Sequence, residues 1–163
     1  MMEASEIKQK VRNALELFYQ KDVFLLQEAL CERCLAHRFA VCLEKQGFQG
    51  YCIDCEYNKS HLNKNTSPKK VSNLNGNYID IIITKRNGNY RDDLVCFEIK
   101  RKTNYKGRAK DRENLKILTG GKKFGYPFGF YIIFGVDKTK TKLELYQHGE
   151  KTEEYSLEVS NEA

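Results

Sequence analysis

The stretch YIDIIITKRNGNYRDDLVCFEIKRK, residues 78–102, decides which fold the sequence predicts. Two β-rich runs, at residues 78–85 and 94–100, flank a polar segment that contains an Asn-Gly turn signal. We expect the two runs to form a hairpin or to lie as near neighbours in one sheet. Because side chains alternate between the two faces of a strand, Glu98 and Lys100 in the second run share a face.

The segments around this stretch predict helices before it, and a helix and strands after it. Apolar spacing indicates helices at residues 5–20, 29–46 and 111–119, and strands at 48–57, 130–136 and 143–146, the last at a sheet edge. Asp111 is expected to cap the third helix, the polar stretch 58–77 to be a loop, and the acidic tail after Gly149 to be peripheral. This order predicts an α/β sandwich around a mixed sheet, in a single domain that covers residues 1–163.

Composition limits the classes of protein to which the chain can belong. Of its 163 residues, 40% are hydrophobic and 31% charged, and no apolar run approaches the roughly 18 residues of a membrane-spanning helix. The N-terminal segment lacks the apolar stretch and cleavage site of a secretory signal, so we expect a cytoplasmic protein without a membrane partner. The six cysteines are expected to be reduced thiols, because a chain of this size can fold without a disulfide framework.

Positive charge is concentrated in one part of the chain. Residues 100–123 contain ten Lys and Arg against two acidic residues, a net charge of +8, whereas the other residues contain 18 basic and 20 acidic side chains. A local excess of this kind indicates a polyanionic partner, and a solvated loop and helix face is the alternative.

Three charged residues, Asp80, Glu98 and Lys100, lie within otherwise apolar strand sequences. A buried and unpaired charge is strongly unfavourable, so these groups need either a metal ion or one another. Two carboxylates on adjoining strands suit Mg²⁺, with the carbonyl of Ile99 as a further ligand, and Lys100 would orient a metal-bound water. A structural ion pair between Lys100 and either acid explains the same residues.

The spacing of these residues resembles a known signature. Asp80 followed 18 residues later by Glu98, Ile99 and Lys100, on two strands joined by a turn, is similar to the PD-(D/E)xK motif of restriction-endonuclease-like and Holliday-junction-resolvase-like nucleases. Three other segments, ERCLAHRFAVCLE at 32–44, CEYNK at 55–59 and KDRENLKILT at 110–119, resemble a group of short bacterial and phage proteins of this kind. The resemblance covers roughly residues 22–136, and Ile79 stands where the family motif has proline.

The resemblance implies a fold, a chemistry and a site. The fold is a restriction-endonuclease-like core of order α-β-β-β-α-β, here with an extra N-terminal helix. The activity is metal-dependent hydrolysis of phosphodiester bonds in DNA, with Mg²⁺ as cofactor and Mn²⁺ as a substitute. Asp80 and Glu98 are the implied metal ligands, and Lys100 assists the attacking water. An acid on the preceding helix often completes such sites, and the apolar stripe of residues 29–46, extended towards its N-terminus, nominates Glu32 first and Glu28 second.

The basic segment supplies the expected contacts with the DNA backbone. The candidate residues are Lys102, Lys106, Arg108, Lys110 and Arg112. A homodimer is compatible with the sequence. The rival hypothesis is a nucleic-acid-binding or regulatory protein that keeps the nuclease fold without catalysis.

Four cysteines suggest a different kind of site. Cys31 and Cys34, then Cys52 and Cys55, have the spacing of a four-cysteine zinc site. The first pair falls in a helical pattern, and its CERC sequence has neither the Gly nor the Pro of a tight zinc-binding turn. The second pair falls in a strand, where positions three apart face opposite sides. We therefore expect these cysteines to be small buried hydrophobic residues, with a zinc-stabilised binding module as the alternative.

Overall fold

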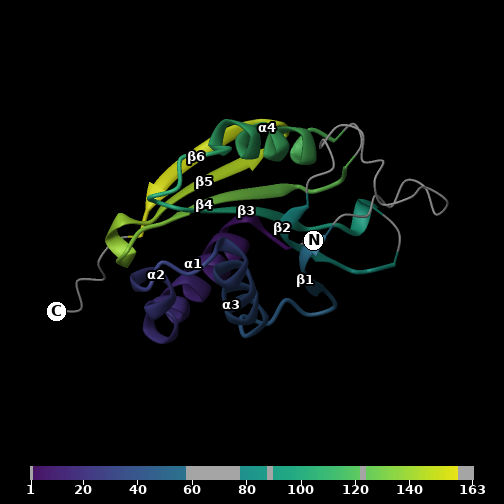
Figure 1. Cartoon of the computed structure of the whole chain (residues 1–163). Helices are drawn as coiled ribbons and strands as arrows, with labels where there is room; N and C mark the ends of the chain where they lie inside the picture. The colour runs from purple at the N-terminus through teal and green to yellow at the C-terminus, as the bar shows by residue number, and fades with distance from the viewer. Residues whose placement is uncertain (1, 58–77, 88–89, 122–123, 158–163) are drawn as a thin grey trace.

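The computed structural model describes residues 2–57, 78–87, 90–121 and 124–157 (Figure 1). Four α-helices, two short 3₁₀ helices and six strands appear in these ranges. In chain order they are α1 (Ala4–Lys21), α2 (Phe24–Gln27), α3 (Glu32–Glu44), β1 (Cys52–Tyr57), β2 (Ile79–Thr84), η2 (Tyr90–Asp92), β3 (Val95–Arg101), α4 (Arg108–Thr119), β4 (Phe128–Phe134), η3 (Lys138–Lys140), β5 (Lys142–Gln147) and β6 (Glu150–Ser156). The loop expected at 58–77 and part of the Asn-Gly turn lie outside the described residues.

The six strands form one mixed sheet in the order β1-β2-β3-β4-β5-β6. All neighbours are antiparallel except β3 and β4, which are parallel and are connected through α4. The expectation that the two runs of residues 78–100 pair as neighbouring strands is therefore confirmed. So is the α/β class with a mixed central sheet, and the elements from α3 to β4 follow the order α-β-β-β-α-β.

Helices cover both faces of the sheet. Figure 1 shows α1, α2 and α3 on one side and α4 alone on the other. Successive side chains of β2 point to opposite faces of the sheet and so contribute to both cores. Ile81 and Ile83 pack in the larger core with α1 and α3, whereas Ile82 packs in the smaller core with α4. No helix in the described part of the chain is long and apolar enough to cross a membrane.

The second expected helix is shorter than the sequence pattern indicates. Residues 29–46 were expected to be continuous, but α3 begins only at Glu32, and Glu28 is the C-cap of the short helix α2. Ala29 between them has a positive φ of 57°, which ends the helix. The Arg101 guanidinium, from β3, donates hydrogen bonds to the carbonyls of Leu26 and Leu30, so the break is stabilised by a tertiary contact that local periodicity does not reveal.

The acidic tail forms a strand rather than a peripheral end. β6 pairs antiparallel with β5, so β5 lies inside the sheet and β6 is the edge strand. Gln147 pairs with Glu150 across a two-residue connection, His148-Gly149, in which both residues have positive φ. This is the backbone of a type I′ hairpin turn. Charged side chains on an edge strand also disfavour pairing with other chains, which explains why so polar a sequence is found there.

Candidate functional site

The register of the sheet brings two carboxylates together. β2 and β3 pair Ile81 with Phe97 and Ile82 with Cys96, and one step further along this register Asp80 lies opposite Glu98. Both side chains project from the face covered by α4, the face of Ile82 and Cys96. The Ile99 backbone amide donates a hydrogen bond to Asp80 Oδ2 at 2.7 Å.

Burial makes this pair of acids electrostatically unfavourable when both are ionised. Glu98 is only 4% exposed. Burial raises the pKa of Asp80 to about 6, although the Ile99 amide and Lys100 act in the opposite direction. Burial and then the charge of Asp80 raise the pKa of Glu98 above its ordinary range. The pair therefore has too little positive charge around it to stabilise two carboxylates.

Lys100 lies between two further carboxylates, from opposite layers of the molecule. Its Nζ is 3.3 Å from Glu32 Oε2 and 3.3 Å from Asp111 Oδ2. Burial lowers the pKa of Lys100, but Asp111 and Glu32 outweigh that effect and raise it above its ordinary value. Lys100 is therefore a cation at neutral pH.

Glu32 is tied to the end of β3 by more than its ion pair. Its Oε1 accepts hydrogen bonds from the Arg101 backbone amide at 3.1 Å and from Asn104 Nδ2 at 2.8 Å. The structure thus brings the helical acid nominated from the sequence to Lys100 rather than to the Asp80 and Glu98 pair. Glu28, the second nominee, is the C-cap residue of α2.

Helix α4 adds two residues that the sequence argument did not place in the site. Gly107 is the N-cap of α4, so the expectation that Asp111 caps this helix is wrong, and its buried carboxylate faces Lys100 instead. Asn114 is buried one turn later and donates from Nδ2 to Glu98 Oε1 at 3.2 Å. A signal for both was present, because they lie on the same helical stripe as Leu115 and Leu118.

Polar side chains continue from Asp80 and Glu98 across the sheet. Glu98 pairs with Tyr131 on β4, and Tyr131 pairs with Glu144 on β5. We call Asp80, Glu98, Tyr131 and Glu144 the polar row. Arg112 on α4 lies over the row, with its guanidinium 4.9 Å from the ring centroid of Tyr131 and its Nε 2.9 Å from Glu144 Oε2.

The predicted DNA contacts divide into two groups. Lys102, Lys106 and Lys110 have exposed side chains. Arg108 instead donates to the backbone carbonyls of Asn104, Arg101 and Lys102, and Arg112 pairs with Glu144. The two arginines thus have structural partners, which leaves the three lysines as the accessible cations of this set.

The donor chemistry at Asp80 and Glu98 fits a divalent cation. Both are carboxylates, both are desolvated, and they adjoin each other, which is the arrangement that a hard cation stabilises together with water and substrate oxygens. Within the ranges that the structure describes, no group of three or more His, Cys, Asp or Glu side chains is arranged as a metal cluster. The fit is therefore one of donor type, and Ile99 as a carbonyl ligand stays a prediction.

The cysteines occupy two kinds of environment. Cys42 and Cys96 are buried, and Cys52 is half-buried. The expectation of burial is wrong for Cys31, Cys34 and Cys55, which are exposed. Cys31 is the N-cap residue of α3, and its Sγ is 3.2 Å from Cys34 Sγ. These two side chains lie in the first turn of the helix, away from the stripe that packs against the sheet. 

No family model, curated protein or solved structure matches this chain.

Proposed function

We propose that the chain is a divalent-metal-dependent nuclease with a restriction-endonuclease-like core, which hydrolyses phosphodiester bonds in DNA. The observation that carries the proposal is the convergence of four elements on one site. β2 and β3 contribute Asp80, Glu98 and Lys100, and α3 and α4 contribute Glu32 and Asp111, each 3.3 Å from Lys100 Nζ. The element order from α3 to β4 supports the same fold.

Asp80 and Glu98 are the residues that would hold the cation in this proposal. When bound, a divalent ion lowers the pKa of a coordinated water and offsets the charge that develops on the phosphoryl oxygens. Asn114 keeps the Glu98 carboxylate in place through its hydrogen bond, and the Ile99 amide does the same for Asp80. These contacts orient the acids before substrate arrives.

Lys100 has the role of a positioning cation rather than a general base. Its pKa is raised, so it carries a proton at neutral pH and can donate to a water or to a phosphate oxygen but cannot accept a proton. Glu32 and Asp111 restrain its ammonium group from two sides. 

Cleavage assays test the proposal directly. Single-stranded, duplex and branched DNA are incubated with the protein in Mg²⁺, in Mn²⁺ and in EDTA. We expect cleavage only with a divalent ion, and loss of cleavage in Asp80→Asn, Glu98→Gln and Lys100→Met. Circular dichroism and thermal unfolding establish that each variant is folded. Undiminished cleavage by the three folded variants would contradict the assignment of the site.

A second candidate function is a nucleic-acid-binding or regulatory protein of the same fold without catalysis. The observation in its favour is that Lys100 already forms ion pairs with both Glu32 and Asp111. DNA binding without cleavage in either metal, on every substrate tested, would favour this candidate over the nuclease.

A further inference from the structure

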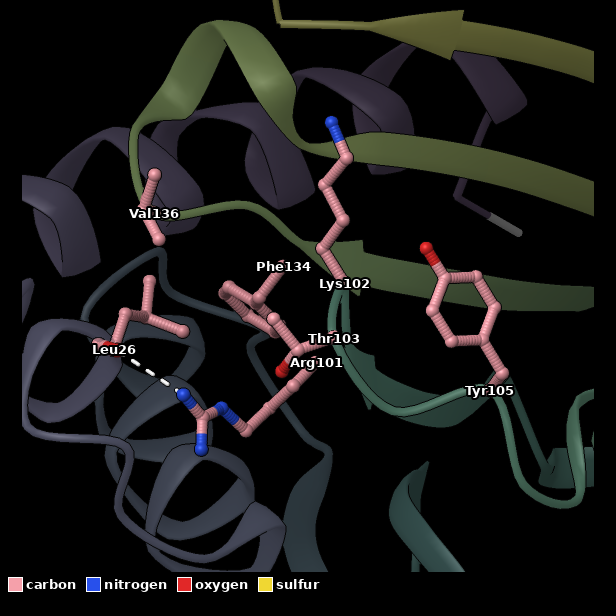
Figure 2. A pocket seen from close by; sticks show the side chains of 7 residues that line it. All are labelled: Leu26, Arg101, Lys102, Thr103, Tyr105, Phe134 and Val136. Atoms are coloured by element: carbon pink, nitrogen blue, oxygen red, sulfur yellow. Dashed lines mark hydrogen bonds between the residues drawn. The ribbon is translucent and has the colours of Figure 1, made fainter.

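A largely apolar pocket lies beside the end of β3. It has a volume of about 360 Å³, within the range of about 300–1,000 Å³ that is common for small-ligand sites. Figure 2 shows Leu26 and Val136 on one side, Tyr105 on the other, and Phe134 and Lys102 between them. We call this hollow the Tyr105 pocket. The Arg101 guanidinium donates a hydrogen bond to the Leu26 carbonyl, which restrains the Leu26 side of the pocket.

A second hollow shares two residues with the first and has the opposite character. Its volume is about 370 Å³, and Lys102 and Tyr105 belong to both hollows. Its lining contains six cationic side chains against two acidic ones. We call it the basic groove, formed by Lys102, Tyr105, Arg108, Lys140, Lys142 and Lys151 together with the Arg112–Glu144 pair, Ile133 and Glu154. Within the described residues, Lys102 and Lys142 form no ion pair, so their charge is available to an anion.

Tyr105 lines both hollows and has the properties of a stacking surface. Its side chain is 72% exposed, the largest exposure among the large hydrophobic residues of the described chain. The guanidinium carbon of Arg108 lies 4.3 Å from its ring centroid, which restrains the ring. An exposed, restrained aromatic ring next to cationic side chains is the usual arrangement for binding an unpaired base.

Both hollows adjoin the candidate active site. Arg101 and Lys102, which line the Tyr105 pocket, directly follow Lys100 in the chain. Arg112, which lines the basic groove, directly follows Asp111, the residue that contacts Lys100. The candidate site and the two hollows are therefore formed by neighbouring residues of β3, of α4 and of the segment between them.

We propose that these hollows bind one nucleotide of single-stranded DNA, with the base in the Tyr105 pocket and the flanking phosphates in the basic groove. This inference rests on the proposed nuclease function and assigns the substrate class of that site. A base in a duplex is stacked on both faces and paired at its edge, so only an unpaired base can enter a pocket and stack on Tyr105. The neighbouring lysines match the charge of its phosphates.

Binding measurements in EDTA test the inference without cleavage. A short fluorescent oligodeoxynucleotide is titrated with the protein as a single strand and as a duplex of the same sequence. We expect Tyr105→Ala to weaken single-strand binding about tenfold or more, and Tyr105→Phe to retain it, because stacking needs the ring but not the hydroxyl. Val136→Trp fills the pocket and leaves the contacts of Arg101 and Lys102 in place. This variant should also weaken single-strand binding. Lys102→Gln should weaken it more than Lys45→Gln, a matched change of an exposed lysine at the end of α3.

A base analogue reports on the pocket itself. We expect the emission of a terminal 2-aminopurine to change when the wild type is added, and this change to be absent with Tyr105→Ala. Equal binding of single strands and duplexes, unaffected by Tyr105→Ala and Val136→Trp, would overturn the inference even if wild type cleaves DNA. Conversely, if these variants lose single-strand binding but no metal supports cleavage, the pocket stands and the nuclease proposal fails.

Discussion

Lys100 is the residue on which the proposed site depends most directly. Its ammonium group joins Glu32 from the layer of α3 to Asp111 from the layer of α4. Each acid restrains the same group, so removal of one leaves the other pair intact but widens the range of positions that Lys100 can adopt. A small displacement of a catalytic group lowers the reaction rate even when the charge of the group is retained.

The first prediction concerns Asp111. We expect Asp111→Asn to reduce the cleavage rate by about one to two orders of magnitude, the effect typical of losing an outer hydrogen-bonding partner of a catalytic group. DNA affinity measured in EDTA should fall little, since the change removes a negative charge. The matched control is Glu113→Gln, an exposed acid on the same helix, which should cleave at the wild-type rate. Equal rates for both variants would show that Asp111 does not position Lys100.

The second prediction concerns Cys31. Its pKa is lowered, chiefly by the hydrogen bond with Cys34, and its side chain is exposed. Because the thiolate is the nucleophile, iodoacetamide should modify Cys31 first and the buried Cys42 and Cys96 last. Mass spectrometry of timed digests measures the order. Cys34→Ala should slow the reaction of Cys31.

The same experiment addresses the zinc alternative. Thiolates bound to zinc react slowly with alkylating agents and become reactive when a chelator removes the metal. If Cys31 and Cys34 react only after a chelator is added, the four-cysteine zinc site is correct and the assignment of these residues as free thiols is wrong.

At the scale of elements, α4 is attached to the sheet by a buried ion pair as well as by apolar packing. Arg112 donates to both oxygens of Glu144, which is only 3% exposed, and Tyr146 donates to Glu144 as well. Burial opposes ionisation of Glu144, but the hydrogen bonds from Arg112 and Tyr146 outweigh it, so the pKa of Glu144 lies below its ordinary value. Without Arg112 a carboxylate would be left buried in the polar row.

The third prediction is that Arg112→Leu destabilises the fold. We expect a loss of about 2–4 kcal/mol in the free energy of unfolding, less than for a fully buried pair because the Arg112 side chain is 36% exposed. Urea unfolding at neutral pH measures it. Lys116→Gln, which affects only the exposed pair with Glu113, is the control and should change stability by less than about 0.5 kcal/mol.

The pH dependence has a definite sign. A depressed carboxyl pKa contributes stability above the ordinary Glu value of about 4.3, and this contribution is lost as pH falls through the folded-state pKa. The stability difference between wild type and Arg112→Leu should therefore shrink as the solution is acidified. A difference that is independent of pH would mean that the ion pair is not its source.

For the whole molecule, the position of the positive charge matters more than its amount. The ten basic residues of the 100–123 segment do not act as one surface. Lys100 is inside the site, Arg108 and Arg112 have internal partners, and Lys102, Lys106 and Lys110 are exposed. Lys122 and Lys123 lie outside the described residues.

The fourth prediction tests this division. Replacing Lys102, Lys106 and Lys110 with Gln should reduce the slope of log affinity against log salt by up to about three units, at about 0.9 per duplex phosphate contact. Affinity should fall alike for all sequences, because backbone phosphates carry no sequence information. A Lys21/Lys45 double Gln variant on the helical layer is the control and should leave the slope unchanged. If the triple variant keeps the wild-type slope, DNA is bound by another surface.

Local sequence patterns were enough to predict strands β1 to β5 and to place Asp80 and Glu98 within them. The runs at 78–85 and 94–100 were sufficient to predict neighbouring strands, because a short, nearly continuous apolar run rich in β-branched and aromatic residues is typical of a buried strand. The shared face of Glu98 and Lys100 follows from the period of two along a strand. Helical spacing also predicted α1, α3 and α4 and brought Glu32 into consideration.

Which of these residues contact one another depends on how the helices pack on the sheet. The break before α3 depends on Arg101 from another element, and the role of Asp111 depends on a lysine that lies across the layer boundary. β6 escaped prediction because its pairing partner, rather than its own polar sequence, makes it a strand. The sequence also could not separate the arginines of the 100–123 segment that have internal partners from its exposed lysines, because those partners lie elsewhere in the fold. Local sequence patterns determine the secondary structure of a segment and the face on which each side chain lies. A contact between residues far apart in the sequence depends on how the layers pack.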